Sequence, residues 1–282
     1  MRISNKSIDR IYVERFVRDR SFRMPEYHLH PYFELYYVEK GTVRVFMNGT
    51  MYDLTQGDLL IIPPEELHYM RYYGASPCRR TNVFFREEDL EEDKIKEALT
   101  FDPVFRKIQI YRIPNEEREE LENLLQYMLR EEVSRDGYTE LLQQVRLKEL
   151  ILLVTRYGES LDSIAEELHT SDAGILAAAG YISEHYAEKI SLQEIAVHAG
   201  FSPNYLSTRF RDMTGLGVHD YLTFVRMRHA VRQLLTTNRS ITDIALDTGF
   251  SSSNYFKDAF KKMYQMTPRE YRKKNGNRSG SR

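Results

Sequence analysis

One pattern of residues occurs twice in this chain, as ISLQEIAVHAGFSPNYLSTRFRDMTGLGVHDY at residues 190–221 and as RSITDIALDTGFSSSNYFKDAFKKMYQMTPREY at residues 239–271. Both copies carry Ile-Ala, Gly-Phe-Ser, Asn-Tyr, Phe, Met and Tyr in the same order, with one inserted residue in the second copy. Self-similarity at a period of about 50 residues indicates two supersecondary units of one design. We therefore expect two related helical units in the C-terminal part of the chain.

Each copy has the signals of a helix, a tight turn and a second helix. In the first copy Ser191 and Glu194 form the S-x-x-E capping box that opens a helix. Gly200 stands where the chain needs a residue with left-handed backbone angles. Ser202 then caps the second helix, and Pro203 occupies its first turn, where a missing N–H costs nothing. The repeat therefore predicts two helix-turn-helix units.

The second helix of each unit has an apolar and a polar face. The inward positions at helical spacing are Leu206, Phe210 and Met213 in the first copy and Phe256, Phe260 and Met263 in the second. A helix fits the major groove of B-DNA, where Asn pairs with adenine and Arg or Lys with guanine. Two such helices would enter successive grooves about one helical turn apart, ~34 Å. The candidate DNA-binding residues are Asn204, Ser207, Thr208, Arg211, Ser253, Asn254, Lys257 and Lys261.

The residues between the two copies predict a long amphipathic helix over 218–235. Its apolar residues would pack inward and hold the two units at a fixed separation. They are Tyr221, Leu222, Val225, Ala230, Val231 and Leu234. Its basic residues, Arg226, Arg228 and Arg232, are candidates for phosphate contacts, and a solvated helix face accounts for them equally well.

Charge is unevenly distributed along the chain, although its net charge is only -2. From residue 175 onward there are 16 Lys and Arg against 9 Asp and Glu, a net charge of +7, which leaves −9 for the residues before. A basic C-terminal part indicates a polyanionic partner for that part alone.

The composition excludes a membrane protein and a disulfide scaffold. No run approaches the ~20 apolar residues that span a bilayer, and the first ten residues lack the apolar core of a signal peptide. Cys78 is the single cysteine, so no disulfide within the chain is possible, which fits a reducing compartment. We expect a cytoplasmic protein with no membrane partner.

Residues 31–86 predict short β-strands separated by turns. In the run VRVFMNGTMYDL two alternating segments flank Asn48-Gly49, a strong signal for a two-residue hairpin. Pro63-Pro64 ends an apolar strand over 59–62, and further strands are expected over 67–73 and 80–85. Many short strands with regular turns favour a sandwich or barrel.

After residue 87 the apolar residues follow helical spacing, which predicts two antiparallel helices joined at Asp136-Gly137. The first apolar stripe is Leu121, Leu124, Leu125, Met128 and Leu129, and the second is Leu141, Leu142, Val145, Leu147, Leu150, Ile151 and Val154. This pair would either pack on the barrel or form a dimer interface. We expect an N-terminal domain over 1–160, a polar linker over 161–174 and a C-terminal domain over 175–282.

The N-terminal part concentrates polar side chains in the segment HLHPYFE, residues 28–34. His28 and His30 are two residues apart, so on a strand they share a face; Glu34 and the later His68 complete the set. Three imidazoles and a carboxylate suit a divalent transition metal. The same residues suit an effector pocket or a structural hydrogen-bonded cluster at the barrel mouth. The 20 tyrosines favour a pocket for a sugar-like ligand, which the segment before Phe22 could cover as an arm.

Residues from about 175 to 273 resemble the DNA-binding domain of AraC/XylS-type transcription regulators. The resemblance is carried by Gly249-Phe250, Tyr255-Phe256, Phe260-Lys261-Lys262 and the ending MTPREYR at 266–272. It implies transcription control, usually activation, with both units in major grooves. Base contacts would fall on Asn204, Ser207, Thr208, Ser253, Asn254 and Lys257. Because Ser207 and Thr208 are short, base reading by the first unit would be weaker or partly water-mediated.

The N-terminal pattern is similar to the cupin signature, H-x-H, then Glu, then a distant His. It departs from the metal-binding form at Glu65, where a glycine is usual. Sensing domains of AraC-type regulators keep this pattern without being enzymes. The resemblance therefore implies an effector pocket lined by His28, His30, Glu34 and His68, with no catalytic residue, cofactor or metal.

The expected fold class is α+β with two domains, a cupin-like β-barrel with a helical hairpin followed by an all-α domain with two helix-turn-helix units. The expected function is sequence-specific DNA binding by a transcription activator that responds to a small molecule, for which a carbohydrate is favoured. We expect it to act as a homodimer with RNA polymerase as a further partner. The alternatives are a metal-dependent cupin enzyme fused to a DNA-binding domain, and a constitutive regulator whose barrel only dimerises.

Overall fold

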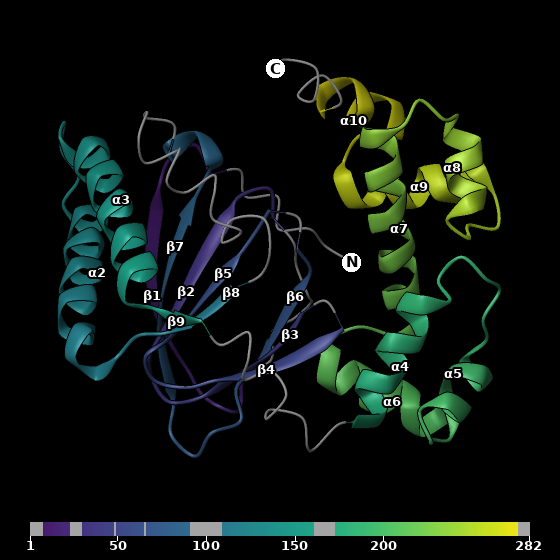
Figure 1. Cartoon of the computed structure of the whole chain (residues 1–282), viewed down its shortest axis with the longest axis horizontal. Helices are drawn as coiled ribbons and strands as arrows, with labels where there is room; N and C mark the ends of the chain where they lie inside the picture. The colour runs from purple at the N-terminus through teal and green to yellow at the C-terminus, as the bar shows by residue number, and fades with distance from the viewer. Residues whose placement is uncertain are drawn as a thin grey trace. The chain divides into compact units, whose positions relative to one another are not determined.

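The computed structural model describes residues 8–22, 30–47, 49–64, 66–90, 109–160 and 173–275. These residues form two compact units, one rich in β-sheet and one that is helical from residue 173 onward (Figure 1). The polar linker predicted over 161–174 lies outside the described residues, except for Ala173 and Gly174, which begin a helix.

The sheet-rich unit contains two antiparallel sheets within the described residues. The large sheet consists, in spatial order, of β1 (Tyr12–Arg18), β7 (Cys78–Phe85), β2 (Phe33–Lys40), β5 (Asp58–Ile62), β8 (Gln109–Arg112) and β9 (Glu159–Ser160). The small sheet consists of β4 (Thr50–Leu54), β3 (Val43–Met47) and β6 (His68–Arg71). The strands predicted over residues 31–86 are confirmed.

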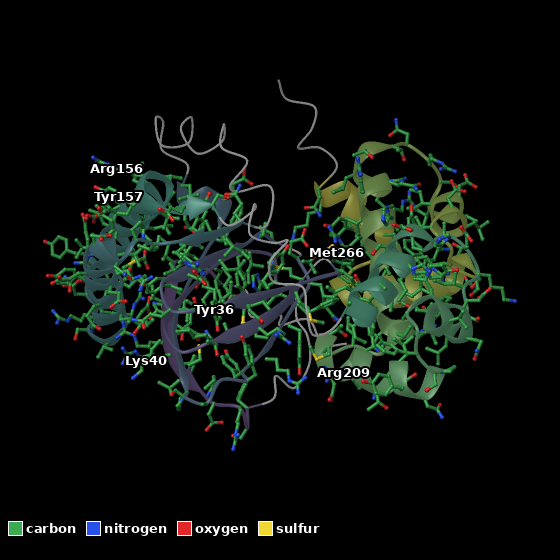
Figure 2. All side chains as sticks on the ribbon, turned by 60° about the horizontal axis from the view of Figure 1, so that its bottom comes forward. Tyr36, Lys40, Arg156, Tyr157, Arg209 and Met266 are labelled. Atoms are coloured by element: carbon green, nitrogen blue, oxygen red, sulfur yellow. The ribbon has the colours of Figure 1, made fainter. Side chains whose placement is uncertain are left out.

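The two sheets face each other across an apolar core, which confirms the cupin-like barrel. Because side chains alternate along a strand, β2 directs Tyr36 and Val38 toward the small sheet, where they join Val43 and Val45. Tyr36 lies among the strands in Figure 2 and is fully buried. Side chains from both sheets therefore line the barrel interior.

The predicted hairpin at Asn48-Gly49 is present. Strands β3 and β4 pair Met47 with Thr50, which leaves a two-residue loop. Gly49 has a φ of 77°, a left-handed value that suits glycine. Asn48 itself lies outside the described residues.

The helices α2 (Arg118–Val133) and α3 (Thr139–Tyr157) pack on the outer face of the large sheet (Figure 1). Their inward residues share one core with Leu35, Tyr37 and Leu59, which point away from the barrel interior; they are Leu121, Leu124, Leu125, Met128, Leu147, Leu150, Ile151 and Val154. Part of the predicted second stripe was wrong, because Leu141, Leu142 and Val145 are exposed. They lie on the side of α3 that the sheet does not cover.

Three strands were not predicted. Strand β1 occupies part of the segment interpreted as an arm before Phe22, and it pairs with β7 along its whole length. Strand β8 lies in the region that was predicted to be helical, and β9 lies at the end of the predicted N-terminal domain, directly before the predicted linker. Both extend the edge of the large sheet beyond β5. Backbone pairing with β7, β5 and β8 holds these segments in the large sheet.

The helical unit follows the repeat. Its helices are α4 (Ala173–Glu184), α5 (Leu192–His198), α6 (Pro203–Thr214), α7 (Val218–Thr236), α8 (Ile241–Asp247), α9 (Ser253–Tyr264) and α10 (Pro268–Asn275). The long helix α7 runs between the two helix-turn-helix units, α5–α6 and α8–α9 (Figure 1). Both turns contain a left-handed glycine, Gly200 with a φ of 71° and Gly249 with a φ of 83°. Among the described helices, none combines the length and apolar character needed to cross a membrane.

Candidate nucleic-acid interface and barrel site

The local signals that open α5 and α6 are confirmed. The hydroxyl of Ser191 accepts a bond from the backbone N–H of Glu194 at 3.2 Å, and the Glu194 carboxylate accepts from the backbone N–H of Ser191 at 2.7 Å. The hydroxyl of Ser202 accepts from the N–H of Tyr205 at 3.3 Å. In the second unit Ser252 does the same for Tyr255 at 3.1 Å. Helices α6 and α9 therefore begin at fixed residues.

The buried faces of α6 and α9 are as predicted, and their residues are Leu206, Phe210, Met213, Phe256, Phe260 and Met263. Aromatic packing in the second unit is dense, with the Phe256 ring centroid 5.0 Å from that of Phe250 and 5.6 Å from that of Phe260. A buried aromatic face fixes which side of each helix is presented to solvent.

Most of the candidate DNA-binding residues lie on the solvent side; those that are exposed are Asn204, Thr208, Arg211, Asn254, Lys257 and Lys261. Ser207 and Ser253 are half-buried. The Ser253 hydroxyl lies 3.4 Å from that of Thr242, and the Thr208 hydroxyl donates to the backbone oxygen of Asn204 at 3.2 Å. These hydroxyls are already engaged locally, so the longer Asn, Arg and Lys side chains are better placed to reach bases.

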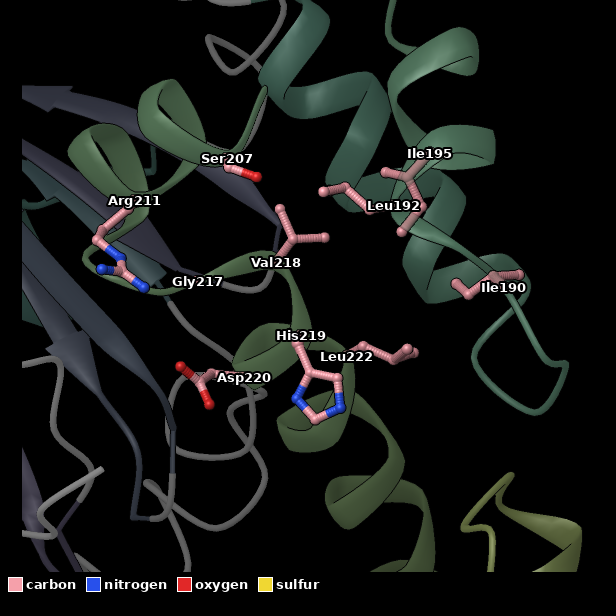
Figure 3. Close-up of a pocket in the computed structure, with 10 residues that line it drawn as sticks. All are labelled: Ile190, Leu192, Ile195, Ser207, Arg211, Gly217, Val218, His219, Asp220 and Leu222. Carbon is pink, nitrogen blue, oxygen red and sulfur yellow. The ribbon is translucent and has the colours of Figure 1, made fainter. Parts of the chain in front are cut away.

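A pocket of about 310 Å³ lies beside α6 (Figure 3). Ser207 and Arg211 line it from α6, and His219 and Asp220 line it from the start of α7. The opposite side is apolar and is formed by Ile190, Leu192, Ile195 and Leu222. This pocket explains why Ser207 is only partly exposed, since it turns toward the space between α5 and α7.

The three arginines of α7 are not equivalent. Arg226 donates from Nε to the backbone oxygen of Tyr186 and from Nη2 to that of Glu188, both at 2.7 Å. The guanidinium of Arg226 therefore binds backbone oxygens within the helical unit, which disfavours its assignment as a phosphate contact. Arg228 and Arg232 are exposed and remain candidates for phosphate contacts.

The barrel brings together three of the four residues of the predicted effector site. His30 Nε2 lies 2.9 Å from Glu34 Oε2, and His68 Nε2 lies 3.4 Å from the same oxygen. Asn82 donates from its side-chain amide to the other oxygen of Glu34. All four side chains are buried. His28 lies outside the described residues.

Backbone oxygens fix the orientation of both imidazoles. His30 Nδ1 lies 2.7 Å from the oxygen of Tyr32, and His68 Nδ1 lies 3.0 Å from the oxygen of Glu66. Because a carbonyl oxygen only accepts, each Nδ1 carries a proton, and each Nε2 is directed toward Glu34. The ligand atoms of His30, Glu34 and His68 lie within 4.8 Å of one another. With Nε2 of both imidazoles deprotonated, these two nitrogens and the carboxylate would form a donor set that fits a divalent transition metal.

Electrostatics keep Glu34 ionised. Burial raises the pKa of its carboxyl, but hydrogen bonds and positive charge from His30 and His68 oppose this and hold the pKa well below its ordinary value. By contrast, burial raises the pKa of the Cys78 thiol to about 11, so this thiol stays protonated at neutral pH. Glu34 therefore places a negative charge in the barrel interior.

A second polar group lines the interior next to Glu34. Arg80 donates from Nε to the hydroxyl of Tyr72 at 3.1 Å, and the hydroxyls of Tyr72 and Tyr36 lie 3.2 Å apart. Sequence analysis missed Arg80 and Asn82. The signal was available, because these two residues alternate on one face of the strand predicted over 80–85.

Comparisons with known proteins match both units. The family model described as an AraC-like ligand binding domain matches residues 12–151, and one described as a helix-turn-helix domain matches residues 195–274. The HTH-type transcriptional activator RhaS of Enterobacter sp. (strain 638) is 26% identical over 250 residues, covering 88% of this chain and 87% of that protein. RhaS of Klebsiella pneumoniae (strain 342) is 25% identical over the same length.

Solved structures give weaker similarity. ToxT of Vibrio cholerae matches with a TM-score of 0.39 at 11% identity, covering 97% of this chain and all of that one, 100%. The C-terminal domain of AraT of Geobacillus stearothermophilus matches at 32% identity over 37% of this chain and 86% of that one, with a TM-score of 0.35. The sequence matches, rather than these low TM-scores, relate the chain to known proteins.

Proposed function

The chain belongs to the AraC family of transcription regulators, and from this we propose that α6 and α9 read DNA while the interior of the sheet-rich unit binds the effector. It is a DNA-binding transcription regulator with a ligand-binding domain. The observation that carries the DNA proposal is that both repeats present a capped helix with a polar, partly basic face over a buried aromatic seam. We place the domains at 1–160 and 175–282, joined by 161–174, and we place the chain in the cytoplasm with its DNA.

Base-reading and phosphate-binding side chains should respond differently to mutation. Replacing Asn254 or Lys257 by Ala removes an exposed group on α9, so we expect a loss of roughly 1–3 kcal/mol at the specific site and relaxed preference for one base. Arg232→Ala should weaken binding evenly across sequences and flatten its salt dependence. The measurement is affinity for a selected site and its single-base variants at several salt concentrations. Equal effects of both kinds of mutation would contradict the assignment.

For the effector we propose a hydroxyl-rich small molecule, with a carbohydrate favoured, bound against the wall formed by His30, Glu34, His68 and Arg80, with His28 as a further contact. Imidazole, carboxylate and guanidinium groups together offer donors and acceptors to hydroxyls. A thermal-shift screen of sugars with the purified chain is the test. A binder that also changes DNA affinity supports the sensor, whereas the absence of any binder favours a constitutive regulator.

The second candidate is a metal-dependent enzyme joined to the DNA-binding unit, which the donor set of His30, Glu34 and His68 favours. A bound divalent metal would supply Lewis-acid chemistry there, and these three residues would hold it. Metal analysis of the purified chain separates the candidates. A stoichiometric transition metal that is lost in His68→Ala, together with turnover of a substrate, supports the enzyme. If the purified chain contains no such metal, the non-enzymatic sensor is the candidate that remains.

We further propose that the chain forms a homodimer through α3 and that the DNA-bound dimer contacts RNA polymerase. The exposed side of α3 carries Leu141, Val145 and Leu152, which are 62%, 55% and 45% exposed. At 3.6 residues per turn these three residues form one apolar stripe, on the side away from the sheet. A second copy of α3 would bury this stripe.

Val145→Glu should therefore yield monomers, because it places a charge in the centre of the stripe. Gln144→Glu is the matched control, since this exposed neighbour lies off the stripe. Sedimentation measures the mass of both variants. A wild-type chain that sediments as a monomer would remove the dimer from the proposal.

A further inference from the structure

The loop between α4 and α5 is held firmly by side chains of α7. Arg226 binds the backbone oxygens of Tyr186 and Glu188, as described above. The ring of Tyr186 also stacks on that of His229, with centroids 3.8 Å apart and planes 8° apart. This loop, residues 185–190, therefore has both its backbone and a side chain fixed to the helix that joins the two helix-turn-helix units.

The turn of the second unit lies directly against this loop. A Cβ atom at Gly249 would stand 2.7 Å from the backbone oxygen of Tyr186, 2.8 Å from that of Ala187 and 2.9 Å from the Cα of Ala187. Only a residue without a side chain permits this approach of backbone to backbone. In Figure 1 the loop between α4 and α5 extends toward the turn between α8 and α9. The contact between Gly249 and the loop therefore connects the two helix-turn-helix units at a second place, in addition to their connection through α7.

The repeat supplies an internal comparison for the glycine. Gly200 occupies the same place in the first unit and has nearly the same backbone, with a φ of 71° against 83° for Gly249. Among the residues that the structure describes, none lies within 4 Å of a Cβ built at Gly200. The left-handed turn therefore favours glycine at both positions. At Gly249 the backbone of Tyr186 and Ala187 also leaves no room for a side chain.

The repeat supplies a comparison for the arginine as well. Arg272 of α10 donates to the backbone oxygens of Leu234 at 3.1 Å and Arg239 at 2.8 Å, which belong to the last turn of α7 and the loop before α8. Arg226 thus fixes the chain that precedes the first unit, and Arg272 fixes the chain that precedes the second. The segment held by Arg226 is the one that meets Gly249.

We propose that the loop at residues 185–190 sets the orientation of α9 relative to α6 and thereby the half-site spacing that the chain accepts on DNA. Helix α7 connects the two units along its own axis and by itself would allow one unit to rotate against the other. The contact at Gly249 adds a second fixed point, which resists this rotation. This inference rests on the proposal that α6 and α9 read DNA.

The test is selection of binding sites from a random-sequence duplex library with the full-length chain. The wild-type chain should enrich paired half-sites with a fixed separation of about 10–10.5 base pairs. In Gly249→Ala the preference for that spacing over one longer by a base pair should fall about tenfold, equivalent to 1.4 kcal/mol. Gly200→Ala carries the same backbone strain without the contact, so it should keep the wild-type spacing even though its melting temperature falls.

Arg226→Gln and Arg272→Gln form a second matched pair of variants. They test the same proposal if the Gly249→Ala chain does not fold. Arg226→Gln should broaden the selected spacing, and Arg272→Gln should leave it unchanged at a similar loss of thermal stability. If Gly249→Ala and Arg226→Gln both keep the wild-type spacing, the role of the loop is overturned. If the wild-type chain enriches no site at all, DNA reading by α6 and α9 fails instead, and the two failures are distinguishable.

Discussion

Phe256→Ala is expected to unfold the second helix-turn-helix unit and to remove specific DNA binding. Phe256 is fully buried and packs against Phe250 and Phe260. Replacing a buried Phe by Ala costs about 3–5 kcal/mol, because the lost burial adds to the cavity left behind. This loss is large for so small a unit, since a whole domain is stable by only about 5–15 kcal/mol.

Hydrogen exchange of the amides in α8, α9 and α10 measures this loss where it occurs. Leu246→Ala is the control, because Leu246 lies in α8 and is 54% exposed, and surface changes stay within about 0.5 kcal/mol. DNA affinity should fall toward the non-specific level, a gap of about 10³-fold or more for typical regulators. If the two variants exchange alike, the aromatic seam does not hold this unit together.

Glu34→Ala is expected to destabilise the sheet-rich unit by about 3–5 kcal/mol, the usual cost of removing one partner from a buried charged pair. The carboxylate of Glu34 is the acceptor for Asn82 and the partner of His30 and His68, and the whole cluster is buried. For a unit of this size the melting temperature should fall by roughly 6–20 °C. Non-specific DNA affinity should change little, because the basic charge lies in the helical unit.

The matched control is Asp53→Ala in the small sheet. Asp53 also accepts two bonds from an arginine, Arg44, each at 2.6 Å, but both side chains are partly exposed. A solvent-screened pair of this kind contributes only about 0–1 kcal/mol. Thermal melts of the full-length variants compare the two carboxylates. Equal shifts for Glu34→Ala and Asp53→Ala would mean that the buried cluster does not stabilise the barrel.

Local signals were enough to predict the helical unit. Serine caps, Pro203 and the turn glycines act within a few residues of their own position, so the sequence and the structure agree on where α5 and α6 begin. The hairpin at Gly49 is local in the same sense. By contrast, β1 and β8 are strands because β7 and β5 offer them backbone partners, which a local pattern does not reveal.

The candidate DNA-binding and effector sites also have a part that the sequence predicted and a part that only the folded structure revealed. The exposed residues of α6 and α9 followed from helical spacing alone. The grouping of His30 with Glu34 followed from their closeness in the segment 28–34. The folded barrel added Arg80, Tyr72 and Asn82 from strands distant in sequence. It also removed Arg226 from the exposed face, because two carbonyl groups on another loop take its donors.

The amino-acid sequence alone determined the repeat, its caps and turns, the polar faces of the reading helices and the family to which the chain belongs. These depend on interactions between residues close in sequence, which a pattern records directly. Only the tertiary structure decided which face of α3 is covered, what surrounds Glu34, and that Gly249 lies against the loop at Tyr186. These depend on the packing of segments distant in sequence, where steric fit and hydrogen-bond geometry, rather than residue type, select the partner.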